Sequence, residues 1–148
     1  MENKNKIFIG VSIAIYFLCL TQATYYTRVT STGSLDPGWM ALLFGWLGLL
    51  VGVFAWLGNI FLFISWYEYF KEKYLNSLVW AVLALFISLS FLLYQEILTD
   101  EGGGKSPITG YGLGYWLWLI SELFTVVSAT IALTSRPRQT PQNGAAGL

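Results

Sequence analysis

The residue best placed to do chemistry is Glu122, a carboxylic acid inside an apolar run that extends from Tyr115 to Leu133. A charged side chain in hydrocarbon is costly, so an acid at this place is a functional-site hypothesis that requires a partner. No Lys, Arg or His lies inside any apolar run of the chain. Because burial without a nearby cation favours the neutral acid, we expect Glu122 to be protonated and hydrogen-bonded across helices.

Depth along the helices suggests which residues could be the partners of Glu122. It lies about seven residues, or ~10 Å, from Tyr115, which we place at the outer interface. Counting inwards from the outer ends of the other apolar runs places Tyr16, Trp46 and Ser88 at a similar depth. With Glu122, these residues form the predicted intramembrane polar site, and a hydrogen bond from Glu122 to Tyr16 or Ser88 is the hypothesis. The alternative is an ionised Glu122 that faces a hydrated cavity or an oligomer axis and selects cations.

The composition favours a bilayer over water as the solvent of this chain. Of its 148 residues, 55% are hydrophobic and only 11% are charged, against about 25% charged in soluble domains. The net charge is zero and no basic patch is present, which argues against nucleic acid as a partner. The chain has no His and a single cysteine, Cys19, which excludes His-dependent catalysis, Cys-rich metal sites and an intrachain disulfide. We therefore expect no catalytic residue, no cofactor and no metal.

Four apolar runs predict transmembrane helices, because a span needs about 20 residues. They cover residues 7–24, 39–67, 75–94 and 112–133. The second run would be ~42 Å long as a helix, against ~30 Å of hydrocarbon. It must tilt, project from the membrane or break, and the sequence does not choose between these. If the helix breaks, the expected place is Gly58-Asn59, since both residues are poor helix formers.

The predicted fold is an all-α four-transmembrane-helix bundle with short loops. It forms one domain over residues 1–135, followed by a flexible cytoplasmic tail over residues 136–148, which is polar and lacks an apolar period.

The positions of Lys and Arg predict the orientation of the bundle. Arg28 and Lys105 lie on one side of the predicted membrane, whereas the other six cationic residues lie on the side of both termini. Those six are Lys4, Lys6, Lys71, Lys73, Arg136 and Arg138. We therefore expect both termini in the cytoplasm and the protein in a bacterial inner membrane.

Small residues recur along three of the predicted spans and predict close helix packing. In the second span they are Gly45, Gly48, Gly52, Ala55 and Asn59; in the third, Ser77, Ala81, Ala84 and Ser88; in the fourth, Ser121, Thr125, Ser128 and Ala132. Each stripe can pack inside one bundle or form an oligomer interface. Because three stripes leave a surplus face on a bundle of four helices, we expect a homo-oligomer.

Two classes of function follow from these features. The first is a small non-enzymatic integral membrane protein that acts through helix–helix assembly, as a membrane subunit, sensor, effector or immunity-type protein. Its partners would be the lipid bilayer and a membrane or cytoplasmic protein. The alternative is an oligomeric ion channel or small transporter with Glu122 facing a hydrated cavity. A membrane enzyme is disfavoured, because the only other clustered acids, Glu96, Asp100 and Glu101, lie on a loop.

Overall fold

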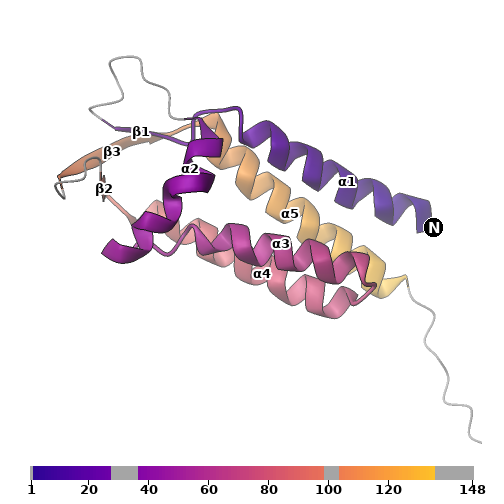
Figure 1. Cartoon of the computed structure of the whole chain (residues 1–148). Coiled ribbons are helices and arrows are strands. Elements are labelled where there is room, and N and C mark those ends of the chain that lie inside the picture. The colour runs from indigo at the N-terminus through magenta and orange to yellow at the C-terminus, as the bar shows by residue number, and fades with distance from the viewer. Residues whose placement is uncertain (1, 28–36, 99–103, 136–148) are drawn as a thin grey trace, which may run out of the picture.

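Within residues 2–27, 37–98 and 104–135, which the computed structural model describes (for residues 2–5 the backbone only), four helices lie along a common direction. They are α1 (Glu2–Cys19), α3 (Leu57–Phe70), α4 (Tyr74–Leu89) and α5 (Leu113–Thr134). Figure 1 shows α1 beside α5 and α3 beside α4, and α5 also packs against α4. The predicted flexible tail, residues 136–148, lies outside the described residues.

A tight turn at Lys71, Glu72 and Lys73 joins α3 to α4 and makes them antiparallel. Glu72 has a φ of 58°, a left-handed conformation that ends the helix and reverses the chain. The start of α1, this turn and the C-terminal end of α5 all lie at one end of the molecule (Figure 1). At the other end, a 3₁₀ turn, η3 (Ser90–Leu93), extends α4.

The second predicted span is not one helix. It is divided into a short helix α2 (Gly38–Phe44), a 3₁₀ segment η2 (Gly45–Val51) and α3. Gly52 follows η2 with a φ of 83°, a left-handed conformation that glycine adopts without steric cost. The break therefore lies at residues 52–56, before the expected pair Gly58-Asn59, which forms part of the first turn of α3.

A small antiparallel sheet caps the end of the molecule opposite the α3–α4 turn (Figure 1). Its strands are β1 (Tyr25–Thr27), β2 (Glu96–Leu98) and β3 (Lys105–Tyr111), in the order β1-β3-β2. The register pairs Tyr25 with Tyr111 and Ile97 with Ser106. The sheet joins the segment after α1 to the segment before α5. The all-α fold class with short loops is therefore wrong, and the chain is mostly helical with a three-stranded sheet.

The prediction of four membrane spans is also wrong. Among the described residues, only two helical segments are long and apolar enough to cross a bilayer, judged by length and composition: Tyr74–Leu93 and Leu113–Thr134. The apolar part of α1, Lys6–Cys19, is shorter. The 14 residues of α3 extend ~21 Å, short of the ~30 Å of hydrocarbon. A four-transmembrane-helix bundle is not what this chain forms, because the break after Gly52 removes half of its second span.

Candidate functional site

Glu122 is fully buried where α5 meets α3 and α4. The Ser88 hydroxyl of α4 donates a hydrogen bond of 2.7 Å to Oε1 of Glu122. The second carboxyl oxygen, Oε2, is buried and has no hydrogen-bond partner among the described residues. Glu122 and Ser88 both have an exposed fraction of 0%. The site is therefore closed, and its acid is held by one short hydrogen bond rather than by a cation.

Gly58 on α3 makes the room for this pair. A Cβ atom at position 58 would overlap the Ser88 hydroxyl and lie 3.0 Å from Cζ2 of Trp118 and 3.3 Å from Oε1 of Glu122. The backbone of α3 therefore lies against the hydrogen bond itself. Counting depth along the helices does not identify Gly58. Its lack of a side chain allows α3, α4 and α5 to meet at this point.

Tyr115 on α5 is hydrogen-bonded to the backbone of Ser88. Its hydroxyl donates a hydrogen bond of 3.0 Å to the Ser88 carbonyl, which lies near the end of α4. The Tyr115 ring is 1% exposed and contacts the rings of Phe91 and Tyr111 at centroid distances of 5.6 and 5.2 Å. Tyr115 thus attaches the start of α5 to the end of α4, and this attachment fixes Ser88 opposite Glu122.

Neither of the other two predicted site residues, Tyr16 and Trp46, is hydrogen-bonded to Glu122 in the described structure. The Tyr16 hydroxyl donates to Oδ1 of Asn59 at 2.9 Å. Nδ2 of Asn59 donates to the Trp56 carbonyl, and the Trp56 indole donates to the Leu42 carbonyl at 2.9 Å. This chain of hydrogen bonds connects α1, α3 and α2 in turn. Trp46 lies in η2 and is 47% exposed, because the broken second span places it away from the helix core.

A second buried polar layer connects α1, α3 and α5. The Ser12 hydroxyl donates to the Ser121 carbonyl at 2.8 Å and lies 2.7 Å from the Thr125 hydroxyl. The Trp66 indole donates to the same Thr125 hydroxyl at 2.9 Å. Ser12 and Thr125 are both 0% exposed. The Thr125 hydroxyl on α5 therefore joins α5 to α1 and α3 within one chain, whereas the buried Ser121 hydroxyl has no hydrogen-bond partner among the described residues.

Two of the three small-residue stripes are buried inside the chain. On α4, Ser77, Ala81, Ala84 and Ser88 are all 0% exposed; on α5, Ser121, Thr125 and Ser128 are 0% and Ala132 is 2% exposed. The stripe of the second predicted span does not share one helix face, because the helix is broken. Gly45 and Gly48 lie in η2, Gly52 forms the turn after it, Ala55 precedes α3 and Asn59 lies within α3. No stripe is left over as evidence for an oligomer, and homo-oligomerisation stays a prediction.

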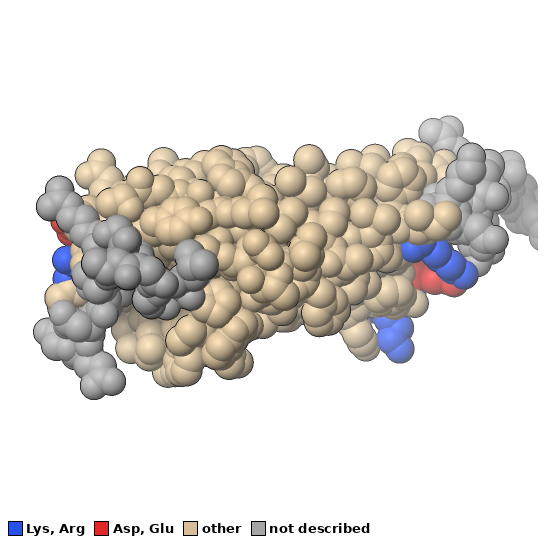
Figure 2. Space-filling model, turned by 90° about the horizontal axis from the view of Figure 1, so that it is seen from above, with Lys and Arg blue, Asp and Glu red and all other residues tan. Residues whose placement is uncertain are grey.

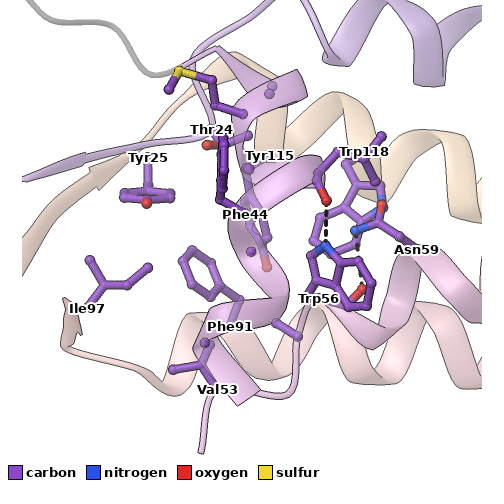
Figure 3. Close-up of a pocket in the computed structure, with 18 of the residues that line it drawn as sticks. Thr24, Tyr25, Phe44, Val53, Trp56, Asn59, Phe91, Ile97, Tyr115 and Trp118 are labelled. Carbon is purple, nitrogen blue, oxygen red and sulfur yellow. Dashed lines mark hydrogen bonds between the residues drawn. The ribbon is translucent and has the colours of Figure 1, made fainter. Parts of the chain in front are cut away.

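A cavity of about 910 Å³ lies between α2–η2 and the ends of the long helices that are near the sheet. Figure 3 shows its lining, which comes from helices and strands across the chain. The labelled apolar side chains Tyr25, Val53, Phe91 and Ile97 lie on one side, and Trp56, Asn59 and Trp118 lie on the other. Glu122 is not a lining residue, whereas Trp118, one helical turn earlier on α5, is. Among the described residues, the lining contains no charged side chain.

Glycines shape this cavity. A Cβ atom at Gly45 would lie 2.6 Å from Cδ1 of Trp56, so the indole can bond to Leu42 only because position 45 has no side chain. Gly52 reverses the chain, and the Val53 amide then donates to the Gly48 carbonyl at 2.9 Å. Gly45 and Gly48, which the sequence suggests as part of a packing stripe, therefore line the cavity, and Gly52 ends the segment that contains them.

No metal centre accompanies these features in the described part of the chain, which has no group of three or more His, Cys, Asp or Glu side chains that could hold an ion. Cys19 is buried as a free thiol. Comparison of the chain with protein-family models, with curated proteins and with solved structures gives no match.

Proposed function

We propose that this chain is a non-enzymatic integral membrane protein with α4–η3 and α5 as its spans. The observation that carries the proposal is the distribution of charge over the described side chains. Figure 2 shows the described Lys and Glu side chains gathered at the two ends of the molecule, with an uncharged body between them on this face. Glu122 is the one described acid within the body, and it is fully buried.

The body between the charged ends exposes large apolar side chains. Phe17 is 63% exposed, Phe86 is 70% exposed and Leu123 is 49% exposed, on three different helices. Soluble monomers rarely expose contiguous apolar patches larger than a few hundred Å², whereas hydrocarbon solvates such side chains. The 20 residues of Tyr74–Leu93 and the 22 of α5 extend ~30 and ~33 Å, which matches the hydrocarbon thickness. The shorter α1 and α3 pack beside these spans.

The cationic residues support an orientation with the sheet outside. Lys71 and Lys73 lie at the α3–α4 turn, at the same end of the molecule as Lys6 in α1. Positive charge beside a span favours the cytoplasmic side. Both termini are then cytoplasmic, and the sheet and the cavity lie at the outer side. The exposed rings of Trp39 and Trp116 near that end suit a membrane interface.

Within the membrane, the protein acts through contacts of its helices and not through catalysis. The buried hydrogen bonds hold the four helices together, so their exposed faces remain for lipid and for other membrane proteins. This is the role of a small membrane subunit. Glu122 does not line the cavity, so no observation on the described residues favours the channel alternative. That alternative stays a prediction.

Alkaline carbonate extraction and cysteine labelling test the proposal. The protein should stay in the membrane pellet at high pH. In a Cys19→Ala background, Lys105→Cys on β3 should react with a membrane-impermeant maleimide in intact cells, whereas Lys71→Cys should react only after permeabilisation. Release of the protein by carbonate, or equal labelling of the two cysteines in intact cells, would overturn it.

A further inference from the structure

We propose that Glu122 is a reversible proton-binding site, and that release of its proton requires the start of α3 to separate from α4 and α5. The acid is neutral in the closed junction of the three helices and ionised in an open one. The protonation of one side chain is thereby coupled to the position of one helix, a property that goes beyond the proposed function.

The junction offers Glu122 too few donors for an ionised carboxylate. Glu122 is fully buried, the Ser88 hydroxyl donates to Oε1 at 2.7 Å, and Oε2 has no hydrogen-bond partner among the described residues. A carboxylate can accept about four hydrogen bonds, and a buried charge without a partner is far more costly than a buried neutral group. The closed junction therefore suits the neutral acid, and the ionised acid needs donors that water can supply.

The ionisable groups near Glu122 do not compensate a negative charge. Among the described residues, Tyr16 and Cys19 on α1 and Tyr115 on α5 are near enough to interact with its charge. All three are acids and cannot carry a positive charge. The ionisable residues of α3 and α4 lie near their common turn, and α2 and η2 contain none. The described lysines lie at the two ends of the molecule (Figure 2).

Because the site is closed, its proton cannot exchange with solvent unless a packed group moves. α4 and α5 are attached to each other here, since the Tyr115 hydroxyl donates to the Ser88 carbonyl at 3.0 Å. The backbone of α3 covers the Ser88–Glu122 pair, because a Cβ atom at Gly58 would overlap the Ser88 hydroxyl and lie 3.3 Å from Oε1. Displacement of α3 at Gly58 therefore admits water to the carboxyl group while α4 and α5 stay together.

The two ends of α3 are attached differently. Towards the α3–α4 turn, Ser65 and Trp66 donate hydrogen bonds to α4 and α5, respectively. The first turn follows the break at residues 52–56, and no side chain caps it. Among the described residues, one side-chain hydrogen bond, from Tyr16 to Asn59, joins this turn to another long helix. The start of α3 is therefore the end that moves, and the end near the α3–α4 turn stays in place.

The direction of the pH dependence follows from proton linkage. A solvated glutamic acid loses its proton near about pH 4.3. At higher pH, the closed junction holds a proton that the open junction does not. The form that binds fewer protons is favoured as the pH rises, so alkaline pH favours the open junction and acidification closes it.

Infrared spectroscopy of the purified full chain in detergent tests the proton site. A neutral carboxyl group gives a carbonyl stretching band that the ionised group lacks. The band of Glu122 should be present at about pH 6 and disappear reversibly by about pH 10, since buried glutamic acids can hold their proton to about pH 8–9. Glu122→Gln should lack the band at both pH values. Glu68→Gln, which removes an acid at the far end of α3, should behave like wild type.

Spin-label distances in the same samples test the movement of α3. In a Cys19→Ala background, labels at the exposed positions Ile60→Cys on α3 and Ile120→Cys on α5 should move apart as the band disappears. Labels at Phe70→Cys and Thr130→Cys, towards the other end of the same two helices, should keep their separation. With Glu122→Gln added, both separations should stay at their acidic values, which distinguishes this motion from alkaline unfolding.

Three results would overturn the inference. The first is the absence, at the acidic pH, of a carbonyl band that Glu122→Gln removes. The second is a band that persists at the alkaline pH. The third is an Ile60–Ile120 label distance that stays constant while the band disappears, or that changes equally in Glu122→Gln. Release of the protein by carbonate contradicts the membrane proposal alone, because the closed junction does not depend on the solvent around the helices.

Discussion

Replacing Gly58 by alanine should destabilise the protein, although alanine is the better helix former. A Cβ atom at this position would overlap the Ser88 hydroxyl and come within 3.0 Å of Cζ2 of Trp118. Ser88 would have to turn away, and the 2.7 Å hydrogen bond to Glu122 would be lost. The carboxyl group would then be buried with neither oxygen bonded to a described residue.

The magnitude follows from three contributions. Alanine in place of glycine favours a helix by about 0.5–1 kcal/mol. An unpaired buried acceptor costs about 1–3 kcal/mol, and an extra methyl group in a packed core costs about 1–3 kcal/mol. The free energy of unfolding should therefore fall by about 1–5 kcal/mol, opposite in sign to the helix propensity.

Titration with sodium dodecyl sulfate, followed by circular dichroism of the purified protein, measures this change. Gly10→Ala is the matched control, since a Cβ atom there meets no described atom within 4 Å, and it should stabilise α1 by about 0.5–1 kcal/mol. The double variant Gly58→Ala/Ser88→Ala removes the hydroxyl that the methyl group displaces. It should be more stable than the sum of its single variants predicts, by about 0.5–3 kcal/mol.

A Gly58→Ala variant as stable as wild type, beside a stabilised Gly10→Ala variant, would refute the close contact of α3 with the Ser88–Glu122 pair. Strict additivity in the double variant would refute the displacement of Ser88 as its cause.

Three further predictions concern single hydrogen bonds and the turn after η2. Glu122→Gln keeps an acceptor for Ser88 and should remain within about 1 kcal/mol of wild type, whereas Ser88→Ala should cost about 1–3 kcal/mol; an equal loss in the detergent titration would contradict this. Gly52→Ala places a side chain at a φ of 83° and should cost about 1–2 kcal/mol, with Gly52→Asn closer to wild type in thermal unfolding. Tyr16→Phe leaves Oδ1 of Asn59 without its 2.9 Å donor and should cost about 1–3 kcal/mol, and an unchanged unfolding midpoint would contradict it.

Helix positions and part of the polar site can be predicted from apolar runs and depth. The runs 75–94 and 112–133 match Tyr74–Leu93 and Leu113–Thr134 closely. Depth counting places Ser88 level with Glu122, and in the structure the two side chains are hydrogen-bonded. This succeeds because both helical segments continue without a break, so the rise per residue fixes the relative height of Ser88 and Glu122.

The same count fails on the second run, because it begins at Trp39 and assumes a continuous helix. It therefore places Trp46 beside Glu122, a position that Gly58 occupies. The sequence contains three glycines within eight residues, at Gly45, Gly48 and Gly52. Such a cluster favours a break in the helix as much as it favours a packing stripe.

The sheet cannot be foreseen from periodicity, since β1 and β2 have three residues each and alternation needs at least four. The third strand contains Pro107 and Gly110, residues that disfavour a strand when no partner is known. Only the pairing of β3 with segments distant in the chain makes it a strand.

The packing of α1 against α5 has a consequence for the biosynthesis of the protein. Ser12 and its acceptor Ser121 are separated by 109 positions, which a ribosome covers in roughly 5–20 s at about 5–20 residues per second. In the proposed membrane location, the first helix would stay in the bilayer during that interval without its main partner. A serine can meanwhile donate to a carbonyl of its own helix, whereas a charged residue would hold the nascent helix at the surface. On the proposal of a membrane location, a hydroxyl at Ser12 therefore suits a helix that enters the bilayer first and packs against its partner last.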